Sequence, residues 1–440
     1  MPKSILARLM KVLRKYMWDD KHNTPVSMAH LYLPFELGGL KLLDLEARNE
    51  AIDITWLKSY LSFGPCRPLW ASVADAIFAL NVPKDCRVKE DMRVSPFLQH
   101  WKPKVSSLPA ELKDPEPVCN ERLDMKLAQS ELHELIIATD GSCIKNGERD
   151  AQAGAGLYVE EGHPLNRSVR LPLTLEQLNQ TGEAIATFLA SSTLEVGVNV
   201  LQETDSKTVM DALTKYRAKH EDTGFIMTKN GQLTCAILAA LRARKAHTGF
   251  KWVKGHDGHP RNEGADKQAG AGALLPPDED INLAAPEALR LSGAKLARTT
   301  QKIAYSAIRT RKEKTVPPRP STVANIANIA SELGEICKYQ VRDDAIWLSL
   351  RKKDITREAR QFMWKTIHDA FMVGRHWLRQ SMPDPLRERA TCKVCLELES
   401  MDHILFRCQA EGWETICSLF EEIWRHTGID WPGMQWGTML

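Results

Sequence analysis

The chain has 440 residues, more than one hydrophobic core usually organises, so its length predicts two or three domains. Hydrophobic residues make up 43% of it and charged residues 26%, a composition typical of an ordinary soluble globular protein. The net charge of +3 is close to neutral, so any surface that binds nucleic acid must be local. No run of about 18 uncharged apolar residues occurs, which predicts that no segment spans a membrane.

The chain divides into regions separated by two predicted linkers. Residues 1–101 predict helices with a middle that is broken by proline and glycine, and residues 102–132, rich in proline and charge, predict a linker. Residues 276–320 predict a second linker, which holds a helix at 286–310. Residues 321–440 predict a helical region rich in tryptophan.

Between the linkers, residues 133–275 combine strand and helix patterns. The runs of strand type are LHELIIATD, AGAGLYVEE, SVRLPLTL, VNVLQETD and GFKWVKGH. The runs of helix type are EAIATFLASSTLE, SKTVMDALTKY, GQLTCAILAALRARK and NEGADKQAGAGAL. Along the chain they give three strands and then helix, strand, helix, helix, strand and helix. This order predicts an α/β domain with a mixed five-stranded sheet and helices packed on its faces.

Four carboxylates in this domain occupy positions that suit metal ligands. Two predicted strands end on Asp140 and Asp205, where a rigid sheet would fix the carboxylates. Glu183 opens a predicted helix after NQTG, and Asp266 lies in the last helix. Each acid alone has a simpler explanation, as a helix cap, a first-turn acid or a solvated side chain. Together they would repel one another without a cation, and two Mg²⁺ ions, which prefer oxygen ligands, would hold them while clamping a phosphodiester.

The elements TDGS, NQxxE, TDSK and GHxGxxxNExAD, in this order, resemble the type 1 ribonuclease H family over about 140 residues. The resemblance implies hydrolysis of the RNA strand of RNA–DNA hybrids, with two Mg²⁺ or Mn²⁺ ions held by Asp140, Glu183, Asp205 and Asp266. It also implies that His256 handles protons near the site at neutral pH, although a lone histidine after glycine is otherwise a surface residue.

Further polar residues match substrate-binding positions of that family. The resemblance implies that Asn146, Asn179 and Gln180 contact the 2′-hydroxyls that distinguish RNA from DNA. Asn230 matches a contact to a DNA phosphate. A structural role in turns is the alternative for these residues. The segment KYRAKHEDTGFIMTKN is not strongly basic and carries Phe225 where cellular members often have tryptophan, which predicts modest affinity for the hybrid.

Cysteine usage predicts a reduced, intracellular protein with one metal site; it does not separate nucleus from cytoplasm. The chain has ten cysteines, and most are widely scattered. Cys392, Cys395, His403 and Cys408 follow the spacing C-x₂-C-x₇-H-x₄-C, which suits one tetrahedral Zn²⁺. Free thiols around a buried histidine are the alternative. Small zinc knuckles often contact single-stranded RNA, so we expect single-stranded RNA as a second ligand besides the RNA–DNA hybrid.

Both flanks of the domain resemble reverse transcriptases of LINE-type (non-LTR) retrotransposons, especially fungal ones. LARLMKVLRKYMWDD and the following LPFELGGLKLLDLEARNEAIDITWL resemble the segment after the polymerase palm. IWLSLRKKDITREARQFMWKTIHDAFMVGRHW and the knuckle resemble the region after ribonuclease H in such elements. The order of the three resemblances implies a retrotransposon-derived protein.

Two other functions stay open at this point. The first is a 3′–5′ exonuclease of the same fold with an acidic site, although Asp140 is followed by Gly-Ser rather than by the Asp-x-Glu usual there. The second is a catalytically inactive retroelement remnant that only binds nucleic acid. The presence of all four acids and His256 favours an active nuclease.

Overall fold

The computed structural model describes residues 2–18, 24–62, 67–81, 135–255, 257–284, 289, 293–428 and 430–439. They form two compact units, each with its own hydrophobic core. The helical unit comprises Met1–Glu46, Glu148–Asp150 and Thr310–Leu440, and the sheet unit comprises Ala47–Gly147 and Ala151–Arg309. In the described residues, no helix combines the length and hydropathy needed to cross a lipid bilayer.

The sheet unit contains a five-stranded mixed sheet with the strand order β3-β2-β1-β4-β5. Its antiparallel part pairs β1 with β2 and β2 with β3, whereas β4 runs parallel to both β1 and β5. This arrangement confirms the predicted α/β class. The strands are β1 (Leu135–Ile144), β2 (Gln152–Tyr158), β3 (Arg167–Arg170), β4 (Val200–Thr204) and β5 (Thr248–Trp252).

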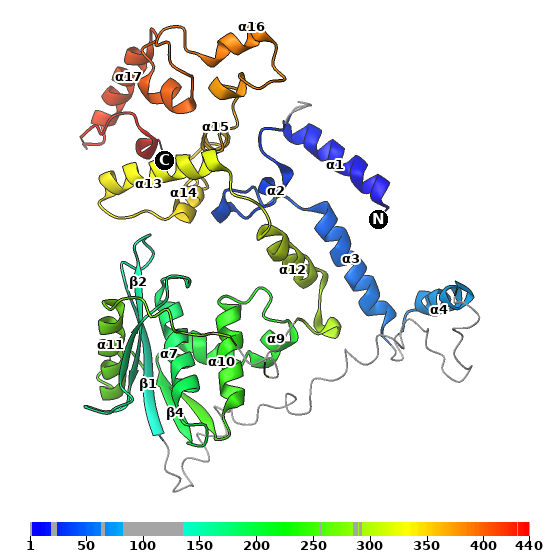
Figure 1. Cartoon of the computed structure of the whole chain (residues 1–440), viewed down its shortest axis with the longest axis vertical. Helices are drawn as coiled ribbons and strands as arrows, with labels where there is room; N and C mark the ends of the chain where they lie inside the picture. The colour runs from blue at the N-terminus through cyan, green and yellow to red at the C-terminus, as the bar shows by residue number, and fades with distance from the viewer. Residues whose placement is uncertain are drawn as a thin grey trace. The chain divides into compact units, whose positions relative to one another are not determined.

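Helices cover both faces of this sheet (Figure 1). Helix α11 lies against one face, and α7 and α10 lie against the other. The sheet unit also holds α3 and α4, which share a small cluster around Tyr60 and Ala71. The helices of this unit are α3 (Leu45–Tyr60), α4 (Leu69–Asn81), α7 (Asn179–Thr193), α8 (Lys207–Leu213), α9 (Arg217–Asp222), α10 (Gly231–Ala243) and α11 (Pro260–Ala273).

Small residues bring α11 unusually close to the sheet. A Cβ at Gly154 would lie 2.3 Å from the carbonyl oxygen of Ala269, and one at Gly156 would lie 2.2 Å from that of Ala265. The opposite face is filled by buried aliphatic side chains such as Ile137, Ile185 and Leu238. The glycines of β2 therefore allow the backbone of α11 to pack directly on this face of the sheet, and buried aliphatic side chains fill much of the opposite face.

Two expectations about the acidic residues need correction. Asp140 does not end its strand, because β1 continues to Ile144 through pairing with β2, in which Asp140 lies opposite Gly156. Glu183 does not open its helix, since α7 already begins at Asn179 and the polar run NQTG forms its first turn. Asp205 does follow directly on β4 as expected.

The helical unit joins the two ends of the described chain in one core. Trp18, Val26 and Leu31 from the N-terminal segment share this core with Ile329 and Trp364. Its elements are α1 (Lys3–Trp18), α2 (Met28–Leu31), η1 (Phe35–Leu37), α13 (Pro320–Cys337), α14 (Asp343–Ser349), α15 (Arg357–Ile367), η6 (Gly374–His376), α16 (Asp384–Arg387), η7 (Glu388–Ala390), η8 (His403–Arg407), α17 (Trp413–Arg425) and η9 (Trp436–Thr438).

The two predicted linkers are described only in part. The linker over 102–132 lies outside the described residues. In the second, the structure shows η5 (Leu296–Arg298) and α12 (Gln301–Glu313), so the helix begins and ends later than the expected 286–310. The domain boundaries drawn from the sequence stay predictions.

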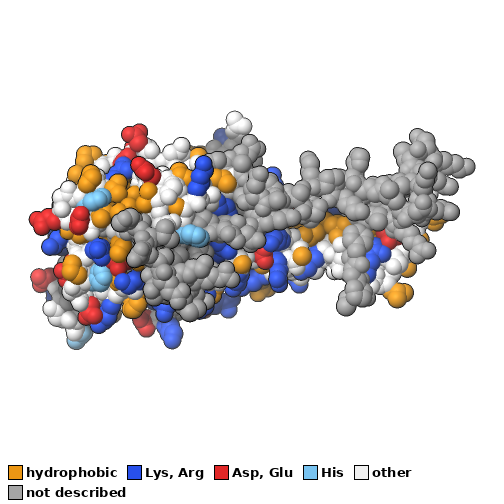
Figure 2. All heavy atoms as spheres, turned by 90° about the horizontal axis from the view of Figure 1, so that it is seen from below, with side chains coloured by type: hydrophobic (Ala, Val, Ile, Leu, Met, Phe, Trp, Pro, Cys, Tyr) orange, Lys and Arg blue, Asp and Glu red, His pale blue; other side chains and the backbone are white. Residues whose placement is uncertain are grey.

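On the face shown in Figure 2, basic, acidic and hydrophobic side chains are intermixed over the coloured residues.

Candidate functional site

Three of the four predicted metal ligands converge at one place in the sheet unit. Asp140 in β1, Glu183 in α7 and Asp205 after β4 each offer a carboxylate oxygen within 4.8 Å of the other two. Asp140 is only 5% exposed, and the other two are half-buried. Asp266 in α11 lies outside this 4.8 Å group, but its charge still acts on Asp140 and Glu183. The site therefore has three tightly grouped acids and a fourth at its margin.

Glycines explain how Glu183 reaches Asp140. A Cβ at Gly141 would lie 2.1 Å from the backbone nitrogen of Glu183, closer than any real side chain could come. A Cβ at Gly182 would lie 2.5 Å from the carbonyl oxygen of Gly154. Because neither glycine has a side chain, the backbone of α7 packs directly on β1 and β2. This contact allows the side chains of Asp140 and Glu183 to hydrogen-bond to each other.

The negative charges of these clustered carboxylates must be balanced by a cation or by bound protons. Burial, and then the charge of Asp205, raises the pKa of Asp140 to about 7, although the Gly141 N–H donates to its Oδ1 at 2.7 Å. Burial, and then the charges of Asp140 and Asp205, raises the pKa of Glu183 to about 10. The buried Oε2 of Glu183 has no hydrogen-bond partner. A divalent cation with oxygen ligands fits, since it offsets the repulsion and pairs this orphaned oxygen.

Asp205 is held by residues that sequence analysis did not single out. The Asn262 side chain, 2% exposed, places its Nδ2 3.4 Å from Asp205 Oδ2. The indole N–H of Trp252 donates to the Asp205 carbonyl oxygen at 3.0 Å. A Cβ at Gly255 would lie 2.3 Å from Asp205 Oδ2. Asn262 and Gly255 occupy specified positions of the motif GHxGxxxNExAD, so the motif could have identified both residues from the sequence.

The predicted substrate-binding residues lie on the surface around this site. Asn179 and Gln180 are exposed in the first turn of α7, the helix that carries Glu183. Asn146 is exposed in the turn between β1 and β2. Asn230 is half-buried, adopts a left-handed conformation with φ 54° and precedes α10. His256 lies outside the described residues.

Comparisons with known proteins agree with this geometry. The model of the family described as RNase H matches residues 133–274. Ribonuclease H of Novosphingobium aromaticivorans is 34% identical over 143 residues, which cover 31% of this chain and 95% of that protein. Ribonuclease H of Citrobacter koseri is 32% identical over 156 residues, covering 34% of this chain and 96% of that protein. Human ribonuclease H1 is 29% identical over 184 residues, and the match covers 40% of this chain but only 59% of the human protein.

The chain therefore belongs to the ribonuclease H family of hydrolases. The match spans the mixed sheet and its acidic site. The resemblance inferred from TDGS, NQxxE, TDSK and GHxGxxxNExAD is confirmed for this domain.

A second group of possible metal ligands lies in the helical unit. Cys392, Cys395, His403 and Cys408 each place a ligand atom within 4.8 Å of the others. His403 is 1% exposed, and neither of its ring nitrogens has a hydrogen-bond partner. Glu397 Oε2 lies 3.4 Å from His403 Nδ1, close enough to orient the ring. The Cys395 backbone N–H, followed by the His403 side chain, lowers the pKa of the Cys392 thiol to about 6. A buried imidazole without hydrogen-bond partners among three cysteine side chains fits a tetrahedral metal site.

The glycine contact predicts that Gly141→Ala inactivates the enzyme. The new Cβ would collide with the backbone of α7 and move Glu183 away from Asp140. Hybrid cleavage is expected to fall at least about 100-fold, as when a catalytic group is misplaced by about 1 Å. The control is Gly270→Ala in α11, where a Cβ meets nothing within 4 Å. Equal activity of the two variants would contradict the proposed packing role.

The raised pKa values predict how the metal-free protein responds to pH. Its folded state keeps protons on Asp140 and Glu183 that the unfolded chain releases above about pH 4. Stability is therefore lost as pH rises from about 4 through the folded pKa of Asp140, about 7, and further towards that of Glu183, about 10. In thermal unfolding with chelator, Asp140→Asn should have a higher Tm than the wild type at about pH 8 and a similar Tm near pH 4. The exposed Asp257→Asn serves as control, and a lower Tm for Asp140→Asn at high pH would refute the account.

Proposed function

We propose that this protein cuts the RNA strand of RNA–DNA hybrids at internal positions and leaves 5′-phosphate and 3′-hydroxyl ends. The observation that carries the proposal is the grouping of Asp140, Glu183 and Asp205 within 4.8 Å in a ribonuclease H sheet. The unpaired Glu183 oxygen and the raised pKa values at this group support a site built for cations rather than a cluster of solvated acids.

The four acids Asp140, Glu183, Asp205 and Asp266 would hold two Mg²⁺ or Mn²⁺ ions. When bound, the ions stabilise charge on the phosphodiester oxygens. The chain's own contribution is to fix the carboxylates: the Gly141 N–H orients Asp140. The Asn262 side-chain amide donates to Asp205 Oδ2, and Gly255, which has no Cβ, leaves room for that carboxylate.

Recognition of the hybrid is assigned to exposed polar residues. Asn179 and Gln180 lie four and three positions before Glu183 on the same helix, so they are fixed relative to a ligand acid. We assign them, with Asn146, to the 2′-hydroxyls of the RNA strand and Asn230 to a DNA phosphate. His256 is assigned to proton transfer near neutral pH.

We further propose that the protein derives from a LINE-type retrotransposon and works inside the cell. The support is the resemblance of both flanks to segments of such reverse transcriptases. We propose that Cys392, Cys395, His403 and Cys408 hold a structural Zn²⁺, forming a knuckle that contacts single-stranded RNA. The support for zinc is the buried His403, whose ring nitrogens have no hydrogen-bond partner, among three cysteines.

The decisive experiment for the nuclease compares Glu183→Gln with Glu195→Gln. Glu195 is an exposed acid after α7, so its loss should leave cleavage unchanged, whereas Glu183→Gln should reduce it at least about 1000-fold. The substrate is a hybrid whose RNA is blocked at both ends, with Mg²⁺ present. Cutting of this substrate excludes an exonuclease. An inactive wild type would instead support the alternative of a remnant that only binds nucleic acid.

The zinc assignment is tested by the metal content of the freshly purified protein. We expect one zinc per chain, lost in Cys395→Ser and kept in Cys337→Ser, an exposed cysteine outside the group. Removing the zinc should destabilise the helical unit and leave hybrid cleavage intact. Freshly purified wild-type protein that contains no zinc would contradict the assignment.

A further inference from the structure

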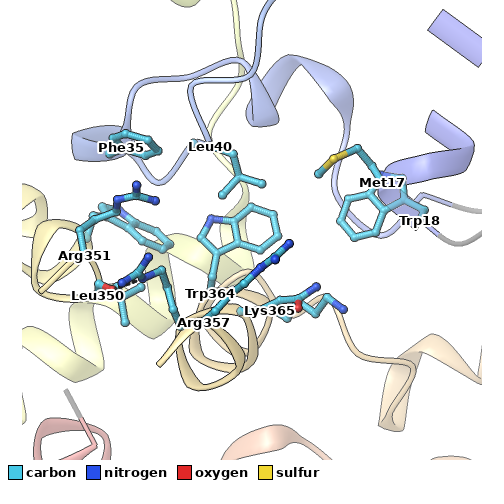
Figure 3. A pocket seen from close by; sticks show the side chains of 13 residues that line it. Met17, Trp18, Phe35, Leu40, Leu350, Arg351, Arg357, Trp364 and Lys365 are labelled. Carbon is cyan, nitrogen blue, oxygen red and sulfur yellow. Dashed lines mark hydrogen bonds between the residues drawn. The ribbon is translucent and has the colours of Figure 1, made fainter. Parts of the chain in front are cut away.

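A pocket of about 350 Å³ lies in the helical unit, and none of the proposed metal ligands lines it (Figure 3). Its volume falls within the range of small-molecule sites, about 300–1,000 Å³. The walls come from the end of α1, the segment around η1, the end of α14 and one face of α15. The lining residues include Trp18, Phe35, Trp347, Arg357, Trp364 and Lys365.

The charge of this pocket is entirely positive. Four of its lining residues are basic, and none of the described lining residues is acidic. Arg360 is committed to the fold, because it donates to the backbone carbonyls of Leu350, Lys352 and Ile355. Arg357 and Lys365 form no ion pair with any described residue. Among the described residues no carboxylate neutralises these two charges, so the pocket favours an anionic ligand.

The cationic side is arranged as a row. Arg357, Gln361 and Lys365 are spaced by four positions on α15, so they lie on one helix face about 6 Å apart along its axis. Lys11, Arg14 and Trp18 likewise share one face of α1, a helix without any acidic residue. Because Trp18 lines the pocket, basic side chains continue from it along α1. A single small anion does not need such an extended series of cations, whereas a chain of phosphates does.

The remaining walls are aromatic and rigid. Trp364 donates its indole N–H to the Gly38 carbonyl oxygen at 2.8 Å, which fixes the ring. Trp347 stacks on His368 with ring centroids 4.9 Å apart. Phe35 lies under the guanidinium of Arg351, whose carbon is 3.8 Å from the ring centroid. Preformed aromatic walls beside a row of cations match the two parts of a nucleotide, the base and the phosphate.

We propose that this pocket binds one nucleotide of a single-stranded nucleic acid, with Arg357 and Lys365 on the phosphates and the aromatic walls around the base. Adjacent nucleotides would follow the basic face of α1. A second contact of this kind would raise the local concentration of the strand for the rest of the chain. The inference stands apart from the nuclease, because binding is measured at equilibrium and needs no cleavage.

The test measures binding of the full chain to labelled single strands by fluorescence anisotropy. The double variant Arg357→Gln/Lys365→Gln should weaken binding at least about 10-fold and lower the salt slope of log K by about 1.4, the value for two phosphate contacts on a single strand. The control is Arg311→Gln/Lys314→Gln, which removes the same charge from exposed positions of the helical unit outside the pocket. Unchanged circular dichroism would show that the variants fold.

Measurements with several ligands distinguish nucleotide binding in the pocket from other causes of the anisotropy change. RNA and DNA strands of one sequence establish which sugar is preferred, and pocket-dependent binding of either supports the proposal. An abasic DNA strand should bind more weakly than the intact strand, since it lacks the base. Equal binding of abasic and intact strands would overturn the nucleotide assignment. Equal losses in pocket and control variants, or pocket-dependent binding only to phosphatidylserine vesicles, would overturn it as well.

Discussion

The direct backbone contact between α7 and β1 is the constraint on which the acidic site depends. Gly141 leaves no room for a side chain against the backbone nitrogen of Glu183. The contact places a helix carboxylate against a buried strand carboxylate, an arrangement that a protein core would otherwise avoid. The sheet then adds Asp205 from the neighbouring parallel strand. A short sequence element, TDGS, thus supplies both one acid of the group and the glycine that brings a second acid to it.

Both candidate metal sites combine shifted pKa values with buried polar atoms that lack hydrogen-bond partners, but their ligand atoms differ. At the acidic site, burial and mutual repulsion raise the pKa values of Asp140 and Glu183, and carboxylate oxygens in such a group suit a hard divalent cation. At the cysteine site, the pKa of the Cys392 thiol is lowered and the ring nitrogens of the buried His403 have no hydrogen-bond partner, which suits a softer ion such as Zn²⁺. One site suits catalysis, where the substrate shares the ions, and the other suits a closed structural role.

Local patterns in the sequence predict much of the fold and of the two candidate sites. The sheet, its helices and the four acids follow from alternating apolar runs and short motifs, and the cysteine spacing is local too. The extension of β1 past Asp140 was missed, because it depends on pairing with the glycine-alanine run of β2. The shared core of the helical unit could not be predicted, because it joins residues as distant as Gly38 and Trp364, 326 positions apart. The pocket in that core was missed for the same reason.

The central claim is that Asp140, Glu183, Asp205 and Asp266 hold a pair of divalent ions. The most direct measurement is a crystal structure of the protein with Mn²⁺ and a non-cleavable hybrid, with the ions located by anomalous scattering. The account predicts two manganese peaks about 3.5–4 Å apart between these carboxylates and a phosphate of the RNA strand. A structure with the hybrid bound and no manganese at these four side chains would contradict it.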